Sequence, residues 1–242
     1  MAIYGIFSDI HGNLEALEAV LNDMEKAGCK KFWCLGDLVG YGANPNECIE
    51  KVRAIADATV LGNHDSACVG MEDTSNFNQY ARKAVDWTAG QIAPYNRDWL
   101  QKLPYTAVVD GVLLVHASPS EPRAWRYMLT ISDMLRGFKA MEGNMAFIGH
   151  SHQPLILINR GEDFFSVNGE EYLVENGVRC IINVGSVGQP RDGVPDASYA
   201  IWEPETRTVR MKRAGYDISA AQRKIREAGL PDILATRLET GN

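Results

Sequence analysis

The sequence predicts an α/β protein that folds as a single domain over residues 1–242. Its 242 residues are 45% hydrophobic and 23% charged, which is enough apolar material for one large buried core. Over the first sixty residues, short apolar runs alternate with segments of helical periodicity, the βαβαβ pattern of parallel strands joined by helices. The second half consists mainly of further short apolar runs, which indicate more strands.

Two helices are predicted within this N-terminal segment. The first ends near Gly28, and its core-facing residues recur at steps of three and four: Leu14, Leu17, Leu21 and Met24. The second begins after Asn44, with Pro45 at its first position and Glu47 at its third, a combination typical of a capping box.

A helical pair is predicted as an insertion at about residues 76–103, with a break at Pro94. A last helix is expected from Asp217 to Ala228, closed by Gly229 and followed by a polar tail. The apolar runs between them predict strands at 106–109, 112–115, 146–148, 155–158, 172–174, 180–184, 199–202 and 209–211.

Charge and cysteine content exclude several classes of function. The 24 basic and 31 acidic residues give a net charge of −7, so no broad basic face and no long nucleic-acid partner are expected. No apolar run approaches the ~20 residues of a membrane span, and the N-terminus does not resemble a signal peptide. We expect a cytoplasmic protein without membrane association, whose five cysteines, an odd number without a CxxC pair, are buried thiols: Cys29, Cys34, Cys48, Cys68 and Cys180.

Six short polar motifs each follow directly on a predicted strand. The carboxyl ends of strands form the edge of an α/β sheet where ligands bind, so the six motifs are expected to converge on one crevice. They are SDIHGN from residue 8, GDLVGYG from 36, GNHD from 62, the single His116, GHSH from 149, and NVGSVGQPR from 183.

All five histidines of the chain fall within these motifs: His11, His64, His116, His150 and His152. A lone histidine is usually structural or exposed, but five at strand ends, beside Asp9, Asp37 and Asn63, indicate a metal site. Mixed imidazole and carboxylate ligands suit zinc, manganese or iron better than calcium or magnesium. The absence of HExxH and of paired cysteines argues against a one-zinc protease and against a structural zinc site.

The order DxH, GD, GNHD, H and GHxH resembles the calcineurin-like metallophosphoesterase family over residues 9–191. The resemblance implies a sandwich of two mixed β-sheets flanked by α-helices, with a dinuclear metal site at the carboxyl ends of the strands. It also implies two divalent transition-metal ions, with manganese favoured and iron, zinc, cobalt or nickel as alternatives. One ion would be held by Asp9, His11, Asp37 and His152, and the other by Asp37, Asn63, His116 and His150, with Asp37 bridging.

By the same resemblance, a hydroxide that bridges the two metals would attack a phosphate ester. Two divalent cations, two carboxylates and one hydroxide leave a net positive charge facing the phosphate, and two metals can stabilise an in-line displacement from both sides. His64 has no metal to bind in this scheme, and the resemblance assigns it to the leaving-group oxygen, with Asp65 orienting its ring. The alternative is that residues 63–65 form only a turn, and the complete set of motifs favours catalysis.

Two departures from related enzymes bear on the substrate. Protein serine/threonine phosphatases of this superfamily read GDxVDRG at the second motif, whereas Gly40 and Tyr41 stand here in place of the Asp and Arg. The chain is more similar to small bacterial metallophosphoesterases, which implies hydrolysis of a small phosphodiester, with nucleotide derivatives as one candidate class. The alternatives are a phosphomonoesterase, including a phosphoprotein phosphatase, a dinucleoside polyphosphate hydrolase, and a non-catalytic protein-binding scaffold.

Several further residues are candidates for holding the non-reacting part of a small phosphate-ester substrate. Arginine binds phosphate in a bidentate way and aromatic rings stack on bases, although a surface salt bridge or simple packing would explain the same residue types. Ser186 is a candidate through its hydroxyl or through the turn around it. The full set is Tyr41, Arg123, Arg126, Ser186 and Arg191.

Overall fold

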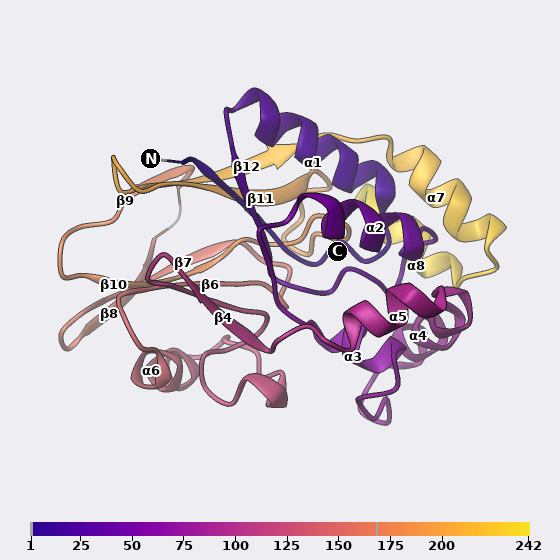
Figure 1. The fold of residues 1–242 in the computed structure, drawn as a ribbon, viewed down its shortest axis with the longest axis horizontal. Helices are drawn as coiled ribbons and strands as arrows, with labels where there is room; N and C mark the ends of the chain where they lie inside the picture. Colours follow the sequence, from indigo (N-terminus) through magenta and orange to yellow (C-terminus); the bar gives the residue numbers. More distant parts are fainter. Residues whose placement is uncertain (1, 168) are drawn as a thin grey trace.

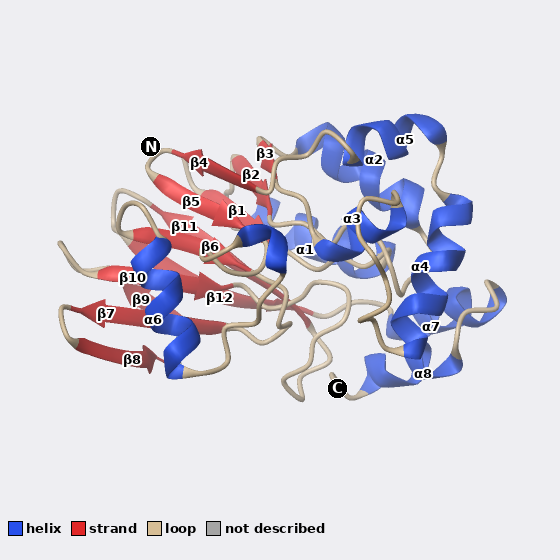
Figure 2. Ribbon diagram, turned by 90° about the horizontal axis from the view of Figure 1, so that it is seen from below, coloured by secondary structure: helices blue, strands red, loops and turns tan. Residues whose placement is uncertain are grey.

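The computed structural model describes residues 2–167 and 169–242. Within these residues, two six-stranded sheets pack face to face, with helices outside them (Figure 1). In Figure 2 the strands occupy one half of the molecule and most of the helices gather in the other. This is the predicted sandwich of two mixed sheets flanked by helices.

The first sheet contains the N-terminal βαβαβ unit. Its strands β1, β2 and β3 are parallel, whereas β11, β12 and β9 continue the sheet in antiparallel fashion from β1. The strand order is β3 (Ala58–Thr59), β2 (Lys31–Cys34), β1 (Tyr4–Phe7), β11 (Ala197–Glu203), β12 (Thr208–Ala214) and β9 (Glu171–Leu173).

The second sheet has its three parallel strands near its centre, unlike the first, where they lie at one side. Strands β5, β6 and β10 run parallel, and antiparallel strands flank them on both sides. The order is β4 (Thr106–Val109), β5 (Val112–Val115), β6 (Met145–Ile148), β10 (Arg179–Asn183), β7 (Leu155–Arg160) and β8 (Asp163–Val167).

Apolar side chains from both sheets fill the space between them. Trp33 of the first sheet and Phe147 of the second are fully buried, with ring centroids 6.4 Å apart. Ile6, Val60 and Ile182 belong to the same buried cluster. Because strand side chains alternate between the two faces of a sheet, the residues on the opposite faces are free to pack against helices.

Helices cover both outer faces and extend the sandwich at one end. Asn13 caps the start of helix α1, because its side chain accepts a hydrogen bond from the backbone N–H of Ala16. Helix α6 lies beneath the second sheet in Figure 1. None of the helices in the described part of the chain has the length and apolar character needed to traverse a bilayer. Their bounds are α1 (Leu14–Lys26), α2 (Pro45–Ile55), α3 (Asn63–Cys68), α4 (Gln79–Gln91), α5 (Pro94–Leu100), α6 (Ile131–Ala140), α7 (Ile218–Glu227) and α8 (Asp232–Thr236), with 3₁₀ turns η1 (Pro122–Ala124) and η2 (Arg237–Glu239).

The structure corrects three local expectations. Asn44 precedes α2, but its side chain donates to Glu47 instead of capping the helix backbone, so the capping box is absent. Strand β8 was not predicted, because Asp163 and Ser166 interrupt its apolar run. The supposed polar tail folds into α8 and η2, since Leu234 and Leu238, four residues apart, are buried on one face.

The five cysteines are unpaired and buried, as predicted. The helical pair expected at 76–103 corresponds to α4 and α5, with the predicted break at Pro94, which is the first residue of α5.

Phe147→Ala tests the core between the sheets. Removing a fully buried aromatic ring leaves a cavity, so we expect the free energy of unfolding to fall by about 3–5 kcal/mol in urea denaturation. Val108 is 67% exposed, so Val108→Ala serves as the control and is expected to stay within about 0.5 kcal/mol of wild type. Equal destabilisation by the two variants would contradict the assigned core.

Candidate metal centre

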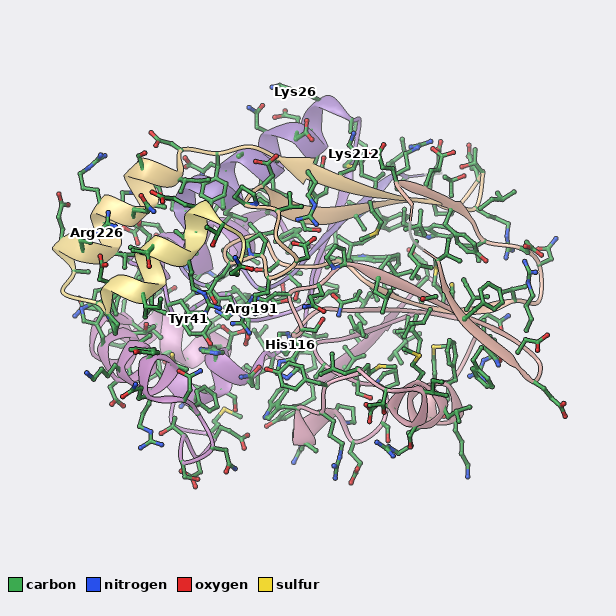
Figure 3. The ribbon with its side chains drawn as sticks, turned by 180° about the vertical axis from the view of Figure 1, so that it is seen from behind. Lys26, Tyr41, His116, Arg191, Lys212 and Arg226 are labelled. Atoms are coloured by element: carbon green, nitrogen blue, oxygen red, sulfur yellow. The ribbon has the colours of Figure 1, made fainter. Side chains whose placement is uncertain are left out.

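The parallel strands of both sheets deliver the six polar motifs to one place. Asp9, Asp37 and Asn63 follow β1, β2 and β3 of the first sheet, and His116 and His150 follow β5 and β6 of the second. Ligand atoms from the two sheets lie within hydrogen-bonding distance, as between Nε2 of His116 and Oδ1 of Asn63 at 3.1 Å. In Figure 3, His116 lies in the middle of the molecule, where the strands meet the helical half.

Five of these residues have a left-handed backbone conformation. The φ angles of Asp9, His11, Asp37, His150 and His152 lie between 51° and 67°. Non-glycine residues adopt this region at a cost of about 1–3 kcal/mol, and they cluster at functional sites where the surrounding structure enforces it. The sharp turns after the strands therefore aim the side chains back over the sheet ends at the expense of local stability.

One cluster of ligand atoms brings together Asp9, His11 and His152. The two imidazole Nε2 atoms are 3.1 Å apart, and Nε2 of His152 is 3.2 Å from Oδ1 of Asp9. Each ring donates its Nδ1–H to a backbone carbonyl, from His11 to Val39 at 3.1 Å and from His152 to Gln189 at 2.6 Å. Neutral rings in this tautomer carry only lone pairs on Nε2, so two lone pairs and a carboxylate oxygen face one another.

The second cluster has the same chemistry around Asp37, His116 and His150. Nε2 of His116 is 3.3 Å from Oδ2 of Asp37, and its Nδ1 bonds the Leu35 carbonyl at 2.8 Å. Nε2 of His150 is buried without a hydrogen-bond partner. The amide oxygen of Asn63, described above, adds a further acceptor to this cluster.

Asp37 lies between the two clusters and also forms a third group of candidate ligand atoms with His11 and His64. The same oxygen, Oδ2, is 3.7 Å from Nε2 of His11 and 3.3 Å from Nε2 of His116. Its other oxygen accepts a hydrogen bond from the backbone of His64 at 2.8 Å. Asp9 is arranged in the same way, because Oδ2 accepts from the backbone of His150 at 2.9 Å while Oδ1 has no hydrogen-bond partner. Each carboxylate is thus anchored by one oxygen and presents the other.

Two glycines of the motifs make room for these anchored oxygens. A Cβ atom at Gly62 would lie 2.1 Å from Oδ1 of Asp37, and one at Gly149 would lie 2.4 Å from Oδ2 of Asp9. Any side chain at either position would displace a carboxylate, which explains the glycines of GNHD and GHSH.

The buried carboxylates and imidazoles of the centre shift one another's pKa values. Burial alone would raise the pKa values of Asp9 and Asp37, but the neighbouring histidines hold both well below the usual range. Burial alone would lower the pKa of His116, but Asp37 and Asp9 outweigh it and raise that pKa to about 9. A proton on His116 therefore offsets part of the carboxylate charge, and a divalent cation would replace it.

These observations fit a metal site. Buried polar atoms are normally paired, but Nε2 of His11 faces Nε2 of His152, and Oδ1 of Asp9 and Nε2 of His150 have no hydrogen-bond partner. Cations at the centre would satisfy these atoms. The seven residues that the sequence predicted as ligands could hold metal in this arrangement: Asp9, His11, Asp37, Asn63, His116, His150 and His152.

Asp65 does not orient the ring of His64, contrary to the expectation from sequence. Its carboxylate accepts hydrogen bonds from the backbone amides of Leu38 at 2.8 Å, Val39 at 3.2 Å and Gly62 at 3.1 Å. As the third residue of α3, its side chain folds back over the start of its own helix. Asp65 instead ties the loop after β2 to α3, and so fixes the backbone on both sides of the centre.

The ring of His64 packs among other rings at the edge of the centre. Its centroid is 4.8 Å from that of His11, 4.5 Å from Tyr41 and 5.0 Å from Phe77. Its Nδ1 is buried without a hydrogen-bond partner and faces Gly40, where a Cβ atom would approach to 2.5 Å. Burial lowers the pKa of His64 to about 4, which keeps the imidazole neutral near pH 7.

The five residues that the sequence suggested as substrate contacts lie in different surroundings. Tyr41 and Arg191 lie beside the centre, as Figure 3 shows. The guanidinium of Arg191 is 5.7 Å from the centroid of the tyrosine ring. Arg123 lines the adjoining pocket, and its guanidinium stacks on Tyr105 at 4.5 Å. Arg126 is exposed and paired with Glu121.

Ser186 has a structural role, which corrects its place among the substrate contacts. Its hydroxyl donates to the backbone oxygen of Asp9 at 2.8 Å and accepts from the amide of Gln189 at 2.9 Å. The side chain is fully buried, so it braces the turn that carries Asp9.

A pocket of about 330 Å³ opens beside the centre. Asn63, His64 and His150 line its inner end, and aromatic rings form its walls. Tyr127 stacks on His150 with ring centroids 4.2 Å apart and an interplanar angle of 21°. Phe77, within the predicted helical segment 76–103, is a further wall residue that its position in the sequence did not mark as part of the site.

Comparison with known proteins agrees with this geometry. A family model described as "Calcineurin-like phosphoesterase superfamily domain" matches residues 1–207. An uncharacterised protein of Methanocaldococcus jannaschii is 41% identical over 99% of this chain and 98% of its own length. A symmetrical bis(5'-nucleosyl)-tetraphosphatase of Pectobacterium carotovorum is 28% identical over 50% of this chain and 44% of its own.

Solved structures show the same fold. A metallophosphoesterase from Sphaerobacter thermophilus is 41% identical and superposes with a TM-score of 0.87, covering 100% of this chain and 99% of its own. A hypothetical protein from Pyrococcus horikoshii superposes with a TM-score of 0.80 over 100% and 99% of the two chains at 19% identity, which shows the fold alone. The family match over most of the chain and the two-sheet sandwich together show that the chain belongs to the calcineurin-like phosphoesterase superfamily.

Proposed function

We propose that this protein is a metal-dependent hydrolase of a small phosphodiester, with nucleotide derivatives as the first class to test. One observation carries the proposal: Oδ2 of Asp37 lies between two groups of buried acceptor atoms, at 3.3 Å from His116 and 3.7 Å from His11. Two cations sharing one carboxylate oxygen would satisfy both groups. We propose manganese for both positions, with iron, zinc, cobalt and nickel as alternatives.

The chain's own residues would position the reacting groups. Two divalent ions held by the seven ligands would activate water and stabilise the charge that develops on the phosphoryl oxygens. His64 lines the adjoining pocket with a neutral ring, and a neutral imidazole carries one N–H that can donate to a leaving-group oxygen. Arg191 places a positive charge beside the same centre.

The pocket supports a diester over a phosphoprotein. Tyr41, Phe77, Trp125 and Tyr127 line it, and such walls suit the second ester group of a diester or a base stacked on a ring. At position 40 a side chain would collide with the ring of His64, so the Asp of GDxVDRG has no room here.

One alternative has specific support, and another is disfavoured. The partial similarity to symmetrical bis(5'-nucleosyl)-tetraphosphatases favours a dinucleoside polyphosphate as the second candidate substrate. A protein-binding scaffold is disfavoured, because all seven candidate ligands and His64 are present and buried.

Asp37→Asn tests the shared ligand. With Mn²⁺ present, we expect wild type to hydrolyse bis-p-nitrophenyl phosphate faster than p-nitrophenyl phosphate, and the variant to lose at least about 10³-fold in kcat, because one oxygen serves both clusters. Metal content by inductively coupled plasma mass spectrometry should fall in parallel.

The exposed Asp163 on β8 gives a matched control, since Asp163→Asn removes the same charge away from the centre. The proposal is contradicted if wild type binds two metal ions and yet turns over neither ester. A clear preference for the monoester would instead favour a phosphomonoesterase.

His64→Ala tests hydrogen-bond donation to the leaving group. One positioned donor that stabilises the charge developing on an oxygen is typically worth about 10²–10³-fold, and it matters most when the leaving group is basic. We expect a loss of that size with a methyl ester of thymidine 5'-monophosphate and a much smaller loss with its p-nitrophenyl ester, at unchanged metal content. Equal losses on both esters would show that His64 acts on something other than the leaving group.

A further inference from the structure

Arg191 is a cation without a carboxylate partner. Among the described residues it forms no ion pair, and its Nε is buried without a hydrogen-bond partner. Its Nη2 donates to the side-chain oxygen of Gln189 at 2.9 Å and lies 3.4 Å from the hydroxyl of Tyr41. Its backbone N–H donates to the carbonyl of His152, so the main chain of Arg191 is anchored beside the metal centre.

A second arginine, Arg237 of η2, converges on the same amide. Its Nη1 donates to Oε1 of Gln189 at 3.0 Å, the atom that Arg191 also contacts. Its Nε donates to the backbone oxygen of Asn242. Burial and then the positive charge of Arg191 lower the pKa of Arg237, as expected for two close guanidinium groups. Gln189 is only 2% exposed, so one rigid oxygen holds both cations.

Two like charges in a partly buried position are unfavourable unless anions offset them, and at Arg237 the main-chain oxygen of Asn242, the last residue of the sequence, offsets part of the charge. No Asp or Glu side chain of the described residues pairs with either guanidinium. Guanidinium groups bind phosphate oxygens through charge-assisted, often bidentate hydrogen bonds, and a single phosphoryl group is large enough to contact both.

Tyr41 connects the pair to the metal centre. A second pocket of about 680 Å³ lies beside the 330 Å³ pocket at the metal centre, and both are lined by Tyr41 and Asn78. Arg237 and Thr236 line the second pocket, whereas His64 and His150 line the first. The guanidinium of Arg191 packs on the ring of Tyr41, which lines both pockets.

From this arrangement we infer that Arg191 and Arg237 form a subsite for a second phosphoryl group, adjacent to the one that is hydrolysed. The substrate class is then an ester or anhydride with a chain of two or more phosphoryl groups. This inference rests on the proposed hydrolysis at the metal centre. Arg237 lies beyond residues 1–207, which match the family, so the C-terminal segment would supply this specificity.

Two chromogenic esters with the same leaving group test the subsite. One is p-nitrophenyl thymidine 5'-monophosphate, and the other carries the p-nitrophenyl group on the terminal phosphate of thymidine 5'-triphosphate. With saturating free Mn²⁺, we expect wild type to favour the triphosphate ester in kcat/KM by about tenfold or more, the scale of one charge-assisted hydrogen bond. Arg237→Gln should reduce this preference about tenfold, chiefly through KM.

The matched control is Arg226→Gln. Arg226 is exposed on the outer side of α7, paired with Asp232 and far from the centre in Figure 3, so the preference should stay as in wild type. Arg237→Lys should retain part of the preference for the triphosphate ester, because lysine keeps the positive charge but lacks the planar guanidinium group. A preference unchanged in Arg237→Gln, or equal losses on both esters, would overturn the subsite.

A binding measurement separates this inference from the proposed activity. Metal-free protein in EDTA is titrated calorimetrically with inorganic tripolyphosphate and with inorganic phosphate. We expect tripolyphosphate to bind more tightly than inorganic phosphate. Arg237→Gln should weaken the binding of tripolyphosphate about tenfold, whereas Arg226→Gln should leave it unchanged. Equal affinities in wild type and Arg237→Gln would refute the subsite even if the esters are hydrolysed. Retained binding without turnover of either ester would refute the hydrolase and leave the anion site standing.

Discussion

The structure depends on a group of hydrogen-bond acceptors that face one another in its interior. Lone pairs of His11 and His152 face each other at 3.1 Å, and an oxygen of Asp37 faces nitrogens of both clusters. Such an arrangement is unfavourable in a low-dielectric interior without positive charge between the atoms. Many other features serve it: left-handed turns aim the side chains, and glycines leave space for the anchored oxygens.

The sandwich is the architecture that allows this convergence. Each sheet contains three neighbouring parallel strands, and parallel strands end at one edge. Packing the sheets face to face brings the two edges together, so candidate ligands far apart in sequence, such as Asp9 and His152, become neighbours. The core between the sheets thereby sets the distance between the two halves of the centre.

Most of this centre is predictable from sequence, because each motif is local. A strand followed by DxH or GNHD places its polar side chains at a strand end regardless of what lies elsewhere. The roles of Asp65 and Ser186 are not predictable in this way, since their hydrogen bonds reach Leu38 and Asp9, whose positions depend on the tertiary fold. The contact of Arg237 with Gln189 is not predictable from sequence for the same reason, because the packing of α8 on α7 brings η2 to Gln189.

The three backbone carbonyls that hold His11, His116 and His152 have a consequence for substitutions at the residues that supply them. Metal-binding histidines are often oriented by carboxylate side chains, which a single mutation can remove. Here the oxygens of Val39, Leu35 and Gln189 do this work, and every amino acid at those positions would present the same carbonyl. The tautomers of these rings are therefore encoded by the path of the main chain. A substitution at Leu35 or Val39 would therefore act through the packing of the core, in which both are fully buried, and one at Gln189 through the two arginines that its side chain contacts; in none of the three would the supporting carbonyl itself be lost.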